Sequence, residues 1–171
     1  MNRPRPFGLV GAFTRLRAQA PAPALWFGLG ALVPLYLGAA AMLVGPFDLA
    51  INAYLHLVHY AALLLAFNGA LHWGLAIAAA MHGRACGWRP YVWGAAAVVL
   101  AWLALGMASP YLRLGTLLIG YSALFSADLA AVADGLAPDW YKSLRKLLTV
   151  AALVAVGGAL LAVVKVTAGS S

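Results

Sequence analysis

The sequence predicts an all-α fold, a polytopic membrane helical bundle of five transmembrane helices with its N-terminus cytoplasmic and its C-terminus outside. Three observations predict it. The 171 residues are 65% hydrophobic and only 9% charged, which is too apolar for an ordinary water-soluble domain. The apolar runs approach the roughly 20 residues that a helix needs to cross a bilayer. Basic residues gather in alternate segments between these runs, where topology signals are found.

The first 22 residues form a basic segment with four arginines and no acid. Two interpretations stay open for residues 1–22: an amphipathic or disordered segment at the inner face of a membrane, or an import sequence for an organelle. The five-helix transmembrane domain is expected at residues 23–166, and a polar tail at 167–171.

Proline and glycine mark the ends of the first helix, expected at about 24–44. Pro34 lies inside it and removes a backbone hydrogen bond. We therefore expect a kink there, and a neighbouring helix or side chain that makes good the loss, because lipid offers no hydrogen-bond partner.

The second helix is expected at about 51–81. Its ~30 residues at ~1.5 Å each reach ~45 Å, which exceeds a simple span. It must tilt, or its first turns must lie outside the hydrocarbon. The remaining three spans are expected at about 91–107, 111–132 and 144–164.

The distribution of basic residues predicts the orientation. With the N-terminus inside, nine of the eleven lysines and arginines fall in cytoplasmic segments, and Arg113 and Lys165 lie outside. The net charge of +7 is then a topology signal, and no nucleic acid partner is expected. We predict the bacterial inner (plasma) membrane as the location, with the mitochondrial inner membrane as the alternative.

A candidate polar site lies at membrane depth. Asn68 and His72 are four residues apart and share a face of the second helix, and Asp128 is the only carboxylate embedded in an apolar span. Such groups cost about 2 to 3 kcal/mol or more each, and they usually face a bundle interior, a cavity or a partner. The candidate site consists of Asn68, His72, Trp73 and Asp128. The alternative is that each side chain satisfies a backbone group or a hydroxyl, or that Asp128 lies in a wetted last turn.

No cofactor and no metal site are predicted. His56 and His59 lie one turn apart near the outer end of the second helix, where a metal or a heme edge is one interpretation and interfacial polarity the favoured one. All four histidines lie on this helix or at its exit, so one chain cannot clamp a heme between two of them. A heme held by a histidine and a methionine, a heme shared with a partner, and quinone binding stay open. Cys86 has no other ligand at metal spacing.

The function predicted from these features is non-enzymatic. No nucleophile elbow or phosphate loop is present, and four acidic residues leave little material for catalysis. The first hypothesis is an accessory or assembly subunit of an inner-membrane complex, with a respiratory complex as one option. Trp140, Tyr141 and Arg145 would contact a partner or a lipid headgroup. The alternative is a small-molecule or proton carrier that uses the His/Asn/Asp site. The expected partners are the lipid bilayer and a membrane protein or a second copy of the chain.

Two segments resemble a known family. Phe67–Gly74, with Tyr60 upstream, resembles the Tyr…Phe-Leu-Gly-Gly-x-His-Trp-Gly segment of the domain of unknown function 3429, and Pro138–Thr149 is similar to its Pro-x-Trp-Tyr-x-x-Leu-Arg-x-x-Leu-Thr segment. Asn68 and Ala70 depart from that pattern, whereas His72 and the residues after it match. The resemblance implies a multi-pass membrane protein with no established activity.

Overall fold

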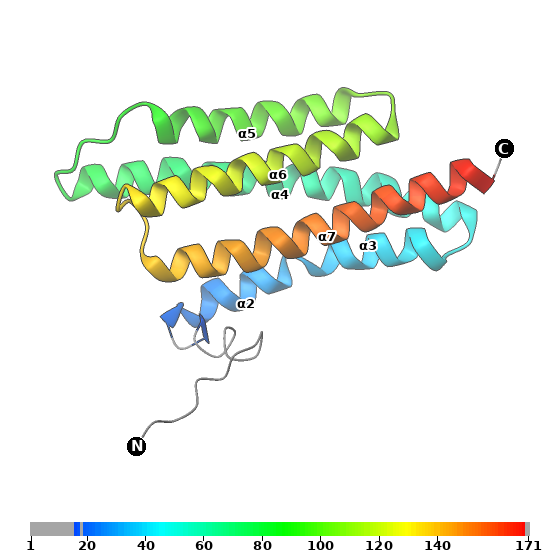
Figure 1. Ribbon diagram of the computed structural model, residues 1–171, viewed down its shortest axis with the longest axis horizontal. Helices are drawn as coiled ribbons and strands as arrows, with labels where there is room; N and C mark the ends of the chain where they lie inside the picture. The colour runs from blue at the N-terminus through cyan, green and yellow to red at the C-terminus, as the bar shows by residue number, and fades with distance from the viewer. Residues whose placement is uncertain (1–15, 18, 170–171) are drawn as a thin grey trace, which may run out of the picture.

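The computed structural model describes residues 16–17 and 19–169 (Figure 1). The secondary-structure elements given below for these residues are α-helices, and they run back and forth along the long axis of the molecule. They are α2 (Ala22–Gly30), α3 (Val33–Val44), α4 (Phe47–Met81), α5 (Arg89–Gly106), α6 (Pro110–Ala133) and α7 (Asp139–Gly169). Among the described residues, five helical stretches are long and apolar enough to cross a membrane, with α2 and α3 together forming the first. The all-helical prediction with five such helices is confirmed, and the orientation stays a prediction.

The first span is broken at the expected proline. α2 ends at Gly30, α3 begins at Val33, and Pro34 occupies the first turn of α3. The hydroxyl of Tyr60 on α4 donates to the carbonyl of Ala31 within the break, at 2.9 Å. The predicted kink and the predicted help from a neighbouring helix are therefore both present. Beyond the break, α2 leans away from the line of α3 (Figure 1).

The last helix is longer than the predicted 144–164. α7 begins at Asp139, directly after Pro138, and its second turn buries Leu144 and Arg145 inside the bundle. The helix continues through Gly169, so the described part of the predicted tail is helical. Residues 1–15, 18 and 170–171, which include most of the predicted basic segment, lie outside the described residues.

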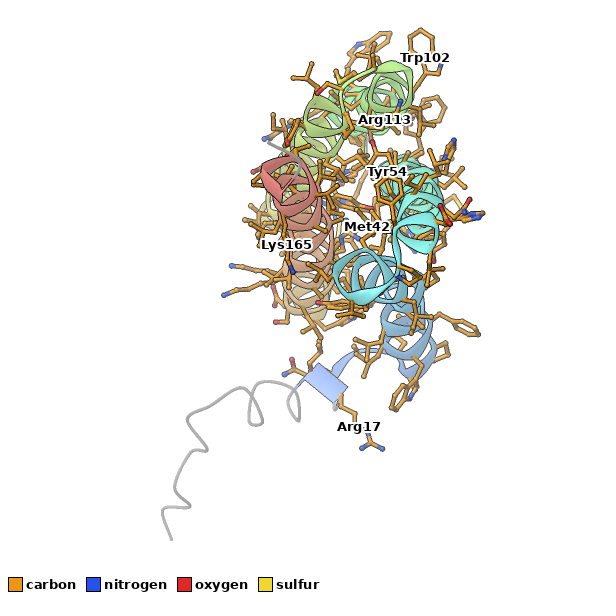
Figure 2. The ribbon with its side chains drawn as sticks, turned by 90° about the vertical axis from the view of Figure 1, so that its right-hand side faces the viewer. Arg17, Met42, Tyr54, Trp102, Arg113 and Lys165 are labelled. Atoms are coloured by element: carbon orange, nitrogen blue, oxygen red, sulfur yellow. The ribbon has the colours of Figure 1, made fainter. Side chains whose placement is uncertain are left out.

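The helices pack through small residues. α4 contacts α3, α5 and α6, and α7 contacts α3 and α6. α4 and α5 approach each other closely, because a Cβ built on Gly69 would lie only 2.4 Å from the Cβ of Ala97. Small side chains allow such contact in lipid, where no hydrophobic effect drives helices together. A view along the bundle shows Trp102 of α5 pointing outward, away from the other helices (Figure 2).

One end of the bundle carries the α4–α5 and α6–α7 loops, and we call it the basic end. Gly83 and Gly135 terminate α4 and α6 there with positive φ of 71° and 67°, a conformation that glycine adopts without steric penalty. The guanidinium of Arg84 then donates to the carbonyls of Gly135 (2.7 Å) and Asp134 (3.1 Å). These bonds fasten the two loops to each other.

Candidate intramembrane polar site and the adjoining cavity

Asp128 of α6 is the centre of the site and is fully buried. Its Oδ2 accepts a hydrogen bond from Nε of Arg145 at 2.6 Å, and its Oδ1 accepts one from the hydroxyl of Tyr141 at 3.0 Å. Both donors come from α7. A buried carboxylate is tolerated when it is paired and hydrogen-bonded, and this one is.

Arg145 links the carboxylate to α4. It is 4% exposed, and its Nη1 donates to Oδ1 of Asn68 at 2.6 Å. The guanidinium carbon also lies 5.9 Å from the centre of the Tyr141 ring. Asp128, Arg145 and Asn68 thus connect three helices through charge-assisted hydrogen bonds, which are the stronger kind.

His72 lies beside this cluster and is 2% exposed. Its Nε2 is 3.2 Å from Oδ1 of Asp128, close enough for an ion pair if the imidazole is protonated. This contact does not have the geometry of a hydrogen bond. Nε2 is therefore a buried nitrogen without a hydrogen-bond partner among the described residues. His72 is therefore the incompletely satisfied member of the site.

The structure brings together three of the four residues that the sequence proposed for this site. Trp73 does not join Asn68, His72 and Asp128, because consecutive helical side chains point about 100° apart. Its indole N–H instead donates to the carbonyl of Tyr91 at 2.9 Å, and the two rings meet edge to face at 5.6 Å. Trp73 is a contact between α4 and α5.

The second group of candidates also needs correction. Arg145 and Tyr141 were expected at the surface, as contacts to a partner or a lipid headgroup, but both reach inward to Asp128. Trp140 is half-buried and packs against the cluster of Leu25 and Leu144. The spacing of the residues in the sequence could have predicted this inward position. Tyr141 and Arg145 share one helix face with Leu148 and Ala152, whereas Lys142 and Lys146 lie on the next face.

His56 and His59 lie apart from the site. Both are exposed, and Nδ1 of His59 contacts the carbonyl of Leu55 on its own helix at 2.7 Å. Among the described residues, no three His, Cys, Asp or Glu side chains are grouped so that they could hold a metal ion.

A cavity of about 480 Å³ borders the cluster between α2, α4 and α7. It lies beside α2, which is tilted away from the line of α3 at the break between the two helices (Figure 1). Its walls are mostly apolar, with Phe27, Leu64, Leu71 and Leu148 among them. The polar cluster contributes Asn68 and Arg145 to the lining, and Thr149 lies beside them.

Where the polar cluster meets the cavity, its acceptor atoms are already hydrogen-bonded, whereas several of its donor groups are not. Both oxygens of Asp128 and the side-chain oxygen of Asn68 accept bonds inside the cluster. Arg145 has five N–H donors, and two of them are used within the described residues. The amide N–H groups of Asn68 and the hydroxyl of Thr149 also make no bond in this part of the chain. The cavity is therefore bordered by donors.

These features define a multi-pass helical membrane protein with a buried polar cluster beside an apolar cavity. The family model described as "Protein of unknown function (DUF3429)" matches residues 20–161, and the chain belongs to this family. The resemblance noted in the sequence is thereby confirmed. Transmembrane protein 69 of Xenopus tropicalis is 32% identical over 144 residues, which cover 84% of this chain and 55% of that protein. The chain thus spans about half the length of this relative. No solved structure matches the sequence of this chain.

Proposed function

We propose that the protein binds a small amphipathic molecule of the membrane in the cavity beside Arg145, without catalysing its conversion. The observation that carries this proposal is the set of unused donors on Asn68, Arg145 and Thr149 beside an apolar cavity. A ligand that fits has a polar head that accepts hydrogen bonds and an apolar body. This is the carrier hypothesis of the sequence, narrowed to one class of ligand.

The charge of the cluster favours a neutral head. Arg145 is already balanced by Asp128 at 2.6 Å, so an anionic ligand would compete with that carboxylate in a medium of low dielectric. A neutral carbonyl can accept a bond from the unused N–H groups without disturbing the pair. We therefore infer a carbonyl-bearing lipid or quinone-type molecule.

The cavity also suits an apolar body that enters from the bilayer. Its volume of about 480 Å³ lies within the range of known small-molecule sites. Phe27 on α2 and Phe67 on α4 line it and are 81% and 63% exposed. Their outward position supports entry from the lipid side, between α2 and α4.

The test is a titration of the purified protein in nanodiscs with decylubiquinone, a benzoquinone with a decyl tail, followed by quenching of tryptophan fluorescence. Thr149→Val removes one hydroxyl at nearly constant volume and is expected to weaken binding about three- to tenfold. Thr116→Val is the matched control, because Thr116 lies on α6 outside the cavity and bonds to Met107. Equal affinity for the wild type and Thr149→Val, or no saturable binding, would contradict the proposal.

The accessory or assembly subunit of an inner-membrane complex, including a respiratory one, is the second candidate. What supports it is the exposure of Trp102 on α5 (70%) and of Trp88 directly before this helix (85%). Tryptophan is typical of protein interfaces as well as of membrane belts. Purification of the tagged protein in a mild detergent, with mass spectrometry, separates the two functions. A stoichiometric set of partners favours the subunit, and recovery of the protein alone favours ligand binding.

A further inference from the structure

A second, much smaller cavity lies on the other side of the polar cluster. It measures about 20 Å³ and is lined by residues of α4, α5 and α6 and by Asp134 near the basic end. His72 forms its inner wall, Arg89 and Asp134 belong to its outer part, and Ala127, Ala130 and Ala131 of α6 line its side. A volume of this size holds one water molecule.

The inner wall of this cavity has a polar group in need of a partner. His72 is 2% exposed, and its Nε2 has no hydrogen-bond partner among the described residues. An unsatisfied buried nitrogen costs about 1 to 3 kcal/mol, and buried waters usually satisfy such groups. Water in the cavity is therefore the natural partner of the imidazole.

The outer part of the cavity reaches solvent. Nη1 of Arg89 lies 3.4 Å from Oδ2 of Asp134, and these side chains are 61% and 50% exposed. Asp134 follows Asp128 by six residues, which is roughly 9 Å along α6. The solvent-exposed carboxylate of Asp134 thus lies a short distance along α6 from the buried carboxylate of Asp128.

We propose that this cavity is a proton path from the basic end to the buried cluster. In the tautomer with its proton on Nδ1, His72 takes a proton from the cavity water on Nε2, and the water regains one from the solvent side. Nε2, which then carries the proton, lies 3.2 Å from Oδ1 of Asp128, and transfer of the proton to that oxygen returns the imidazole to neutrality. The carboxyl that results no longer balances the charge of Arg145.

Protonation by this path changes the ligand site described above. A neutral Asp128 leaves Arg145 as an uncompensated cation beside the larger cavity, so its donors bind a head more strongly. This regulatory role depends on the proposed function, whereas the path itself does not. The charged or titratable groups around His72 are Arg89 on α5, Asp128 and Asp134 on α6, and Tyr141 and Arg145 on α7.

The path is tested without ligand, by NMR of nanodisc-embedded protein carrying ¹⁵N-labelled histidine. The exchange of the His72 ring proton with water is measured, and the resonance is assigned by its loss in His72→Gln. Ala131→Val fills the small cavity and is expected to slow this exchange at least tenfold. Ala133→Val is the matched control, because Ala133 is exposed on the same helix.

A second variant guards against misfolding of Ala131→Val. Asp134→Asn changes an exposed group at the mouth of the cavity and is expected to slow exchange several-fold at the same pH. Wild-type exchange rates in both Ala131→Val and Asp134→Asn would overturn the path. Slowed exchange in a protein that shows no saturable quinone binding would refute the proposed function and leave the path standing.

Discussion

Replacement of Arg145 by methionine should strongly destabilise the bundle. Asp128 is fully buried, and Arg145, at 2.6 Å, is its partner of permanent charge. The variant keeps most of the side-chain volume but leaves an uncompensated carboxylate, which costs about 3 to 5 kcal/mol. The hydroxyl of Tyr141 at 3.0 Å remains and offsets a small part of that cost.

The double variant Arg145→Met, Asp128→Asn makes the reasoning testable. With both charges removed, the free energy of unfolding should return to within about 1 to 2 kcal/mol of the wild type. The free energies can be measured by steric trapping in bicelles. Arg89→Met is the matched control, since its ion pair with Asp134 is exposed and should contribute about 0 to 1 kcal/mol. If the effects of Arg145→Met and Asp128→Asn, each measured alone, simply added in the double variant, the two residues would not form the coupled pair described here.

Two further variants probe how the helices are held together. Gly69→Ala should lower the free energy of unfolding by about 1 to 3 kcal/mol, because the new methyl would lie 2.4 Å from the Cβ of Ala97; an unchanged melting temperature in detergent would argue against that contact. Tyr60→Phe should cost about 1 kcal/mol, since the carbonyl of Ala31 in the broken first span loses its donor, and the fluorescence of a probe on α2 would report the loosened helix.

The spans and their breaks follow from local sequence. Apolar length, proline and glycine predicted the ends of the spans closely except for the start of α4 and both ends of α7. Pro34 was enough to predict both the kink and a partner for the freed backbone. The identity of that partner was not predictable. Tyr60 is 29 residues away, and its reach to Ala31 depends on how α3 and α4 pack.

The polar site was half predictable, for a physical reason. Matching depth on two helices placed His72 and Asp128 together, because both spans must cross the same bilayer. Arg145 was misplaced, since a basic residue near a helix end usually reaches for the interface. The isolated carboxylate held the missing information. Asp128 needed a cation, and Arg145 is the charged residue on the apolar face of its own helix.

The structure also bears on whether these polar residues merely satisfy nearby backbone. Ser122 and Ser126 do so, since each donates to the carbonyl four residues earlier on α6. Asp128 and Arg145 instead bond to side chains from other helices, and the cluster exists only when α4, α6 and α7 are assembled. Such a cluster stabilises little more than an apolar contact of the same volume would. The cluster lies between the cavity of about 480 Å³ and the one of about 20 Å³. Ligand binding and proton transfer, as proposed above, therefore explain this position better than a contribution to stability does.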